Sequence, residues 1–422
     1  MIKIFNFQFS IFNFIKHPLF SGSMILVIGS NSVSFLNYLY HFVMGRMLGP
    51  SSYGELVVLI SVIGFLGIIP GSLSMVIIKY ISSAKNQDEI AILTNWLKDR
   101  SFKVALGLFI LIVIISPFII SFLHINQLWY MLLVAATYFF SIPSLVNKSV
   151  LQGLLKFKEM MFAVLAENLA KLVLAVLLVY VGFAIGGVMV SLAVASVVGW
   201  YISKIYLKDF KRQRNPNLSD IRPMLLFAIP VMIQSFSVTS LISSDLILVK
   251  HFFSAHDAGI YSAISTLGKI IFFGAGPIGA VIFPMVAGKQ SKGEDYRRVF
   301  IYSLAATFFL ALGLLSIYWL FPSLIITMLY NSSYLEGKNL LFWFGLSMSL
   351  FTVSSLLISY SLSLGKTKVV IFPLVAASLQ IILIWFYHYS LFSVISVSIS
   401  VIALLLVSLL IYLSFGKESL WK

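Results

Sequence analysis

Long apolar runs recur along almost the whole of this chain, and they constrain its fold more than any other feature. Stretches of roughly twenty residues with few charges follow one another from Ser23 to Phe415, which is the length that a helix needs to cross a bilayer. Lipid offers no partner to a free backbone group, so spanning segments must be helical or form a closed barrel. The alternating ten-residue segments of a membrane β-barrel are not found in the sequence. We therefore predict an all-α membrane protein.

Twelve membrane spans are predicted from these runs. Their bounds are Ser23–Met44, Tyr53–Ile78, Val104–Leu123, Leu128–Asn147, Met160–Val181, Ala184–Ile202, Met224–Val249, Gly259–Met285, Val299–Leu320, Leu340–Leu364, Val369–Tyr387 and Leu391–Phe415.

Basic residues are distributed unevenly between the loops that join these spans. If the N-terminus is cytoplasmic, 24 of the 29 Lys and Arg residues fall on the cytoplasmic side. The other side keeps Arg46, Lys250 and Lys338, while Lys171 and Lys269 lie within spans. Because cations concentrate in cytoplasmic loops, both termini are predicted to be cytoplasmic. The net charge of +15 then belongs to loops facing an anionic leaflet and does not indicate nucleic-acid binding.

The sequence carries no signal for a metal or other cofactor. It contains no Cys, and its six His residues show no metal-ligand spacing. It also lacks the Gly-x-x-x-x-Gly-Lys-Ser/Thr run that would bind the phosphates of ATP. A coupling ion, H⁺ or Na⁺, is compatible with the sequence, which does not identify it.

A charged stretch near the midpoint divides the chain into two similar halves. We expect an N-terminal six-helix lobe at 1–207, a cytoplasmic linker at 208–222 and a C-terminal six-helix lobe at 223–422. Each half contains a similar passage after its first helix, Gly45–Gly54 in one and Lys250–Tyr261 in the other. This repetition predicts two lobes of the same topology around a central cavity.

Each half also contains a helix interrupted by Gly and Pro. Pro70 and Pro277 stand 207 residues apart, close to half the chain length. Such interruptions let a helix bend, so we interpret them as hinges for rocking of the lobes, with packing kinks as the alternative. The candidate hinge residues are Gly67, Pro70, Gly71, Gly276, Pro277 and Gly279.

Three short passages, taken with the six-plus-six arrangement, resemble a known family. They are Leu-Gly-Pro-x-x-Tyr-Gly at Leu48–Gly54, Asp-Leu-Ile-Leu at Asp245–Leu248 and Ala-Gly-Ile-Tyr-Ser-Ala at Ala258–Ala263. The chain is similar over essentially its whole length to the polysaccharide-transporter branch of the multidrug/oligosaccharidyl-lipid/polysaccharide exporter superfamily.

The resemblance implies a flippase and not an enzyme. Its substrate would be an undecaprenyl-diphosphate-linked oligosaccharide, the repeat unit of an O-antigen, capsule or other exopolysaccharide. Transport would run from the inner to the outer leaflet of the bacterial inner membrane. A polysaccharide polymerase and chain-length machinery are the protein partners that this implies.

Leaving aside Glu55 at the outer rim of the second span, four acidic or basic side chains are predicted inside the spans, where each needs a partner, water or substrate. Glu167 and Lys171 stand four residues apart on one helix face, where they can neutralise each other or line the substrate path. Lys269 is a candidate cavity cation, and the resemblance places its helix at the cavity. Asp245 is a candidate path or gating residue, with pairing to Lys269 as the alternative.

Further path residues are proposed at the ends and on the polar faces of the spans. Arg46 and Lys250, at matching exits of the two halves, lie at the predicted outer mouth or anchor the helices at the interface. Asn31, Asn37, Gln234 and Ser235 are candidates for contacting sugar or for packing helices together.

Three other interpretations compete with a flippase. A drug exporter of the same superfamily predicts a dominant acidic site, whereas two acids accompany two lysines within these spans. A membrane-bound polysaccharide polymerase or acyltransferase predicts a long external loop or a catalytic His in a polar cluster, and the longest external segment here is only Phe321–Asn339. A purely structural protein leaves the duplicated interrupted helices unexplained.

Overall fold

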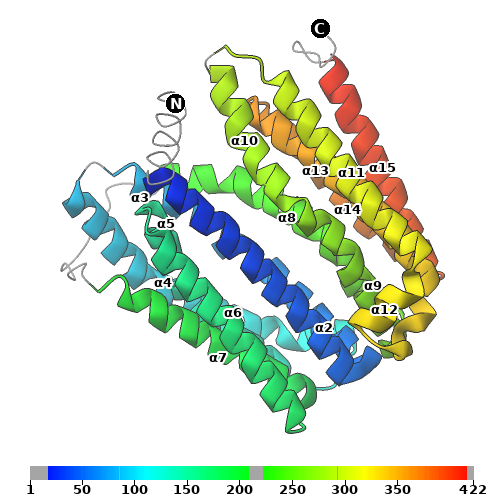
Figure 1. Ribbon diagram of the computed structural model, residues 1–422. Helices are drawn as coiled ribbons and strands as arrows, with labels where there is room; N and C mark the ends of the chain where they lie inside the picture. Colours follow the sequence, from blue (N-terminus) through cyan, green and yellow to red (C-terminus); the bar gives the residue numbers. More distant parts are fainter. Residues whose placement is uncertain (1–17, 85, 209–221, 292, 416–422) are drawn as a thin grey trace, which may run out of the picture. The chain divides into compact units, whose positions relative to one another are not determined.

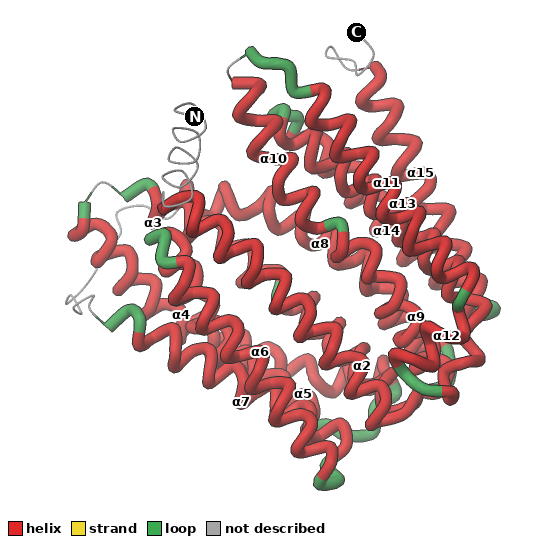
Figure 2. The backbone as a smooth tube through the Cα atoms, in the orientation of Figure 1, coloured by secondary structure: helices red, strands yellow, loops and turns green. Residues whose placement is uncertain are grey.

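The computed structural model describes residues 18–84, 86–208, 222–291 and 293–415. In these residues the chain is helical, with short loops and no strand (Figure 2). The first half contains α2 (Pro18–Leu66), α3 (Ile68–Ser82), α4 (Gln87–Leu123), α5 (Trp129–Gly153), α6 (Phe157–Tyr180) and α7 (Ala184–Ile205). The second half contains α8 (Arg222–Phe252), α9 (Ala255–Gly274), α10 (Gly276–Ser291), α11 (Arg297–Leu320), α12 (Pro322–Leu329), η1 (Ser332–Gly337), α13 (Lys338–Ser363), η2 (Thr367–Val370), α14 (Ile371–Phe386) and α15 (Leu391–Phe415), as Figure 1 shows.

Eleven helical segments within the described residues are long and apolar enough to cross a membrane. The all-α membrane fold is thus confirmed, while the number twelve stays a prediction. The difference arises at α2, which runs through the first predicted span and into the second. Gly49 interrupts its helical backbone with φ 72°, a left-handed value that glycine adopts without strain.

The helix interruptions occur close to the Gly/Pro sequences that predicted them. One helix ends at Leu66 and the next begins at Ile68, so the break falls on Gly67. In the second half, α9 ends at Gly274 and α10 begins at Gly276, with Ala275 between them. Whether these breaks act as hinges stays a prediction.

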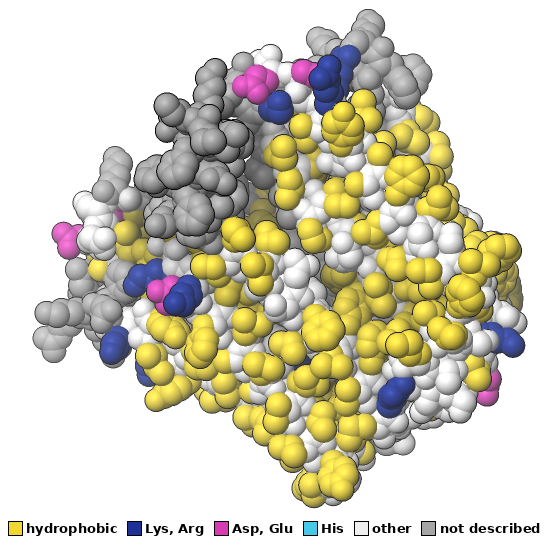
Figure 3. All heavy atoms as spheres, in the orientation of Figure 1, with side chains coloured by type: hydrophobic (Ala, Val, Ile, Leu, Met, Phe, Trp, Pro, Cys, Tyr) yellow, Lys and Arg dark blue, Asp and Glu magenta, His cyan; other side chains and the backbone are white. Residues whose placement is uncertain are grey.

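Large apolar side chains are exposed on many of these helices. Phe118 is 74% exposed, Phe309 69% and Trp319 67%, and apolar side chains predominate over charged ones on the face in Figure 3. A protein surrounded by water rarely exposes so much contiguous apolar surface. Lipid chains are the medium that suits these side chains.

The chain forms two compact units by its internal contacts. The first comprises the described residues of Met1–Tyr40, Ile69–Ser121 and Asn126–Ala228. The second comprises the described residues of His41–Ile68, Phe122–Ile125 and Ile229–Lys422. Residues 41–68 therefore pack with the second half of the sequence. Most of the linker predicted at 208–222 lies outside the described residues, so the boundary between the two lobes stays a prediction.

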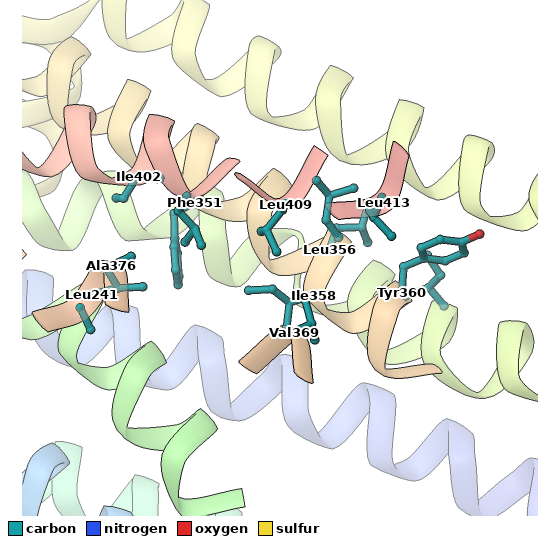
Figure 4. Packing of buried hydrophobic residues seen from close by; sticks show 14 of the residues in the cluster. Leu241, Phe351, Leu356, Ile358, Tyr360, Val369, Ala376, Ile402, Leu409 and Leu413 are labelled. Carbon is teal, nitrogen blue, oxygen red and sulfur yellow. The ribbon is translucent and has the colours of Figure 1, made fainter. Parts of the chain in front are cut away.

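The second unit is built around an apolar core. Phe351 and Leu357 of α13, Ile402 and Leu409 of α15 and Ala377 of α14 are almost fully buried in it. Figure 4 shows such side chains from α13, α15 and neighbouring helices converging. Close-packed side chains of this kind hold helices together in lipid, where the hydrophobic effect does not. This packing fixes the helices that carry the charged residues of the second unit.

Candidate functional site

The first charged group, which we call the Glu167 cluster, lies in the first unit and comprises Asn37, Tyr40, Lys148, Glu167 and Lys171. Glu167 on α6 accepts a hydrogen bond and an ion pair from Lys148 on α5. Lys171, one turn along α6, donates to Asn37 on α2. Its ammonium also lies 4.7 Å from the ring centroid of Tyr40, a geometry that stabilises a cation over an aromatic face. The cluster thus joins three helices of the first unit.

This arrangement differs from the pairing that the sequence suggested. Glu167 and Lys171 were expected to neutralise each other along the helix, but the carboxylate contacts Lys148 instead. Lys148 was assigned to a cytoplasmic loop because the predicted fourth span ends at Asn147. Since α5 continues to Gly153, Lys148 lies within the helix, with its side chain only 17% exposed.

Gly199 on α7 makes room for the Glu167 carboxylate. A Cβ at this position would collide with Glu167 Oε2 and lie 3.1 Å from Ser144 Oγ. The missing side chain lets α7 approach α6 where the ion pair forms. Small residues at such helix contacts are typical of membrane proteins.

The second charged group, the Asp245 cluster, lies in the second unit and comprises Asp245, Tyr261 and Lys269. Asp245 on α8 is 2% exposed, and its Oδ2 accepts a hydrogen bond of 2.7 Å from the Tyr261 hydroxyl on α9. Its Oδ1 is buried and has no hydrogen-bond partner among the described residues. The carboxylate is therefore held from one side only.

Lys269 stands two turns beyond Tyr261 on α9. Its charge attracts that of Asp245, yet the two side chains form no ion pair within the described part of the chain. Lys269 is half-buried. The alternative in which Asp245 pairs directly with Lys269 is not what the structure shows, because Tyr261 is the group in contact with the carboxylate.

A third group, the tyrosine cluster, comprises His41, Tyr53, Thr266, Tyr330 and Tyr334 in the second unit. The Tyr53 hydroxyl lies 2.9 Å from that of Tyr330 and 3.2 Å from Thr266 Oγ1, and His41 Nδ1 lies 3.1 Å from it. Burial raises the pKa of Tyr330 well above its usual value, so this phenol remains protonated. The cluster fixes α2 to helices of the second half.

The two similar passages of the sequence pack against each other beside this cluster. A Cβ on Gly54 would lie 2.7 Å from the backbone nitrogen of Gly259, and one on Gly259 would collide with the carbonyl of Pro50. Only glycine permits backbones to approach this closely. Both glycines of the motifs therefore serve the contact between α2 and α9.

The two cations predicted at the outer mouth have partners within the second unit. Arg46 donates to the carbonyl of Met328 and, at 3.4 Å, to that of Thr327. These carbonyls end α12, where a cation also opposes the negative end of the helix dipole. Lys250 is 4% exposed and attracts the carboxylate of Glu55. These contacts favour structural roles for Arg46 and Lys250.

Of the remaining polar candidates, Asn37 and Asn31 form hydrogen bonds, and Gln234 has a side-chain oxygen without a partner among the described residues. Asn37 holds Lys171, and Asn31 donates to the carbonyl of Val27 one turn earlier. Gln234 on α8 is half-buried and its Oε1 has no partner among the described residues. Ser235 is half-buried beside it. In the described ranges, no three His, Asp or Glu side chains come together to hold a metal ion.

Comparison with known proteins assigns the chain to a family. A family model described as "Polysaccharide biosynthesis protein" matches residues 19–290. The chain belongs to this family. A comparison with curated proteins found no match.

Solved structures share the fold at low sequence identity. An inward-facing multidrug resistance MATE family transporter is 16% identical with a TM-score of 0.71, covering 91% of this chain and 93% of that chain. The lipid II flippase MurJ in an inward closed conformation is 13% identical with a TM-score of 0.74, covering 92% and 87%. The MATE multidrug transporter DinF-BH is 15% identical with a TM-score of 0.63, covering 97% of each chain.

Family and fold together confirm the predicted place in the multidrug/oligosaccharidyl-lipid/polysaccharide exporter superfamily. The chain is a multi-pass membrane protein with the fold of transporters and flippases.

Proposed function

We propose that this protein is a flippase for an undecaprenyl-diphosphate-linked oligosaccharide, moving it from the inner to the outer leaflet by alternating access. Membership of a polysaccharide biosynthesis family supports a saccharide cargo. The fold, shared with MurJ and with MATE transporters, supports translocation across the bilayer. In this proposal both termini are cytoplasmic, as the distribution of Lys and Arg predicts.

The observation that carries the proposal is an excess of positive charge in the two charged clusters. Lys148, Lys171 and Lys269 stand against Glu167 and Asp245, whereas the sequence had suggested equal numbers. Within the described residues, only one of the three lysines contacts a carboxylate. A diphosphate needs such cations to leave water, while its prenyl chain remains in lipid.

The membrane potential supports transport in the proposed direction. With the cell interior negative, moving a charge of about −2 outward is favoured by roughly 5 kcal/mol per 100 mV. The diphosphate itself can thus supply part of the driving force. Returning the emptied, cationic site moves positive charge inward, which the same potential also favours.

Flipping of a lipid-linked oligosaccharide in reconstituted vesicles tests the proposal. Because no carboxylate of the described chain contacts Lys269, we expect Lys269→Ala to reduce the flipping rate at least tenfold and Lys269→Arg to retain most of it. Lys171→Ala should reduce the rate less, since Asn37 and Tyr40 already hold that side chain. Exposed Lys338 provides the matched control, and Lys338→Ala should flip at the wild-type rate.

Unchanged flipping by Lys269→Ala, with the variant folded and inserted, would exclude Lys269 from the path. If Lys338→Ala also lost flipping, the loss in Lys269→Ala would be explained by the lower net charge or by misfolding, and not by a role in the path. Failure of the wild type to flip any lipid-linked oligosaccharide would overturn the proposed function itself.

A second candidate function is export of cationic drugs, and Asp245 is the observation that favours it. Its Oδ1 is buried with no partner in the described residues, so a cation could displace the present arrangement. Efflux of a cationic dye from vesicles under a proton or sodium gradient distinguishes the two functions. Efflux that is lost in Asp245→Asn, with no flipping of lipid-linked sugar, would favour the exporter.

A further inference from the structure

A pocket of about 440 Å³ lies in the first unit and is lined by residues of α4, α5 and α7. Its basic side chains are Lys98 of α4, Lys204 of α7 and Lys208 just beyond α7. Asp99 is the acidic residue of the lining, which also includes Asn147 and Trp200. We call it the basic pocket. Its charged lining carries three positive groups and one negative group.

The walls of the basic pocket are held by contacts between the three helices. Asn147 Nδ2 donates to Ser203 Oγ over 3.2 Å, joining α5 to α7. The Lys98 ammonium donates to the carbonyl of Leu207 over 3.1 Å, joining α4 to the turn that follows α7. The ring of Trp200 lies 5.8 Å from that of Phe102, edge to face. These contacts between helices fix the shape of the pocket.

The positive charge of the basic pocket calls for an anion. Lys98 and Lys204 are close enough to repel each other, and Lys204 rests 4.9 Å from the ring of Trp200. The segment that follows Lys208 begins with Asp209 but has a net positive charge. Residues 209–221 contain two aspartates and three Lys or Arg. An anion from outside the chain would relieve the repulsion.

Exposed apolar side chains on the helices that line the basic pocket bring membrane lipid within reach of it. Phe102 on α4 is 37% exposed, and Tyr201 and Ile205 on α7 are 58% and 43% exposed. Acyl chains can cover these side chains while the headgroup enters the pocket. Basic pockets between helices at the cytoplasmic side of a membrane are a known setting for lipid headgroups.

We propose that the basic pocket binds the phosphate headgroup of an anionic phospholipid from the surrounding leaflet. The orientation that underlies the proposed function makes this the cytoplasmic leaflet, because the loops at this end of α4, α5 and α7 carry the excess of cations. The bound lipid bridges α4 and α7 through Lys98 and Lys204. The proposal concerns binding alone and does not depend on what the protein transports.

Native mass spectrometry of the detergent-solubilised full chain, titrated with phosphatidylglycerol, tests the proposal. We expect one tightly retained phosphatidylglycerol and no equivalent retention of phosphatidylcholine. Lys204→Gln and Lys208→Gln should each raise the Kd for phosphatidylglycerol about fivefold, and the double variant about 25-fold. Each lysine near an anionic lipid surface contributes about 1 kcal/mol, which corresponds to this change in Kd. Lys204→Arg should bind like the wild type.

Two comparisons make the test specific. The double variant leaves Lys98 and its hydrogen bond to Leu207 in place. Its control is the double variant Lys289→Gln/Lys338→Gln, which alters two lysines elsewhere. Without lipid, the two double variants should have the same unfolding temperature. Unchanged phosphatidylglycerol binding in the Lys204/Lys208 double variant overturns the proposal. So does displacement by inorganic phosphate alone, which would indicate a soluble anion, or by undecaprenyl diphosphate at lower concentration, which would assign the pocket to the transport substrate.

Discussion

The Glu167 cluster and the Asp245 cluster accommodate ionisable groups inside a membrane protein in different ways. In the first, Glu167 contacts Lys148, while Lys171 is held by an amide and an aromatic ring. In the second, the only direct partner of Asp245 among the described residues is the Tyr261 hydroxyl, and Lys269 forms no ion pair there. An ion pair in contact neutralises its charges and joins helices. A carboxylate and an ammonium kept apart leave both charges available to a substrate or an ion.

Of the two clusters, the Glu167 cluster is predicted to contribute more to the stability of the fold. Glu167→Gln leaves Lys148 without its counter-charge, and we expect a loss of about 3 kcal/mol in the free energy of unfolding, as for other ion pairs broken from one side. Chemical unfolding in detergent, followed by circular dichroism, measures the change. Transport per folded molecule should change little.

A double replacement separates the charge from the packing. Lys148→Met with Glu167→Leu removes both charges at similar volume and should recover most of the lost stability. The single variants Lys148→Met and Glu167→Leu complete a double-mutant cycle, and a coupling energy near zero in it would mean that the ion pair contributes nothing. Equal transport defects in Glu167→Gln and Lys269→Ala would erase the distinction between the clusters.

A smaller effect on stability, with a larger one on transport, is expected from Tyr261→Phe. The change removes the hydrogen bond to Asp245 Oδ2 and leaves the buried carboxylate without a donor, which should destabilise the protein by about 1–3 kcal/mol. If Asp245 gates the path, the flipping rate falls more than this loss of folded protein explains. Flipping and unfolding are to be measured on the same preparations.

Tyr318 provides the matched control for Tyr261. Its hydroxyl is also buried in the second unit and donates to a backbone carbonyl, that of Leu267, over 2.6 Å. Tyr318→Phe therefore removes a comparable hydroxyl without touching a carboxylate. Equal transport rates in the two variants would leave Asp245 with a structural role only.

Much of the fold could be predicted from the sequence, because lipid imposes strong rules on helix length and hydropathy. The helix breaks near Pro70 and Pro277 could also be predicted, since Gly and Pro weaken a helix locally. The partner of Glu167 could not. Its identification required knowing that α5 extends past Asn147 and which face of α5 meets α6, and neither is encoded by spacing along a single helix.

The tyrosine residues were missed for a related reason. Tyr53 and Tyr261 stand in the passages that carried the family resemblance, so a signal for their importance was present. The partner of Tyr53, however, comes from a distant segment, with Tyr330 lying 277 residues away, and the bond from Tyr261 to Asp245 joins two different helices. Aromatic residues are frequent in a membrane protein, and only the packing distinguishes a buried phenol with a hydroxyl partner from one that faces lipid.

The smallest expected effects concern the two interrupted helices, which also differ between the units. The chain passes from the second unit to the first between Ile68 and Ile69, directly after the break at Gly67, whereas Gly279 lies inside the second unit.

A Cβ at Gly71 or Gly279 would meet no neighbouring atom of the described chain within 4 Å. Alanine should therefore stabilise either helix by about 0.5–1 kcal/mol. If the segment around Gly71 bends during transport, Gly71→Ala should slow flipping more than Gly279→Ala, despite equal gains in stability. Equal rates in both variants, at wild-type level, would reduce both interruptions to packing kinks.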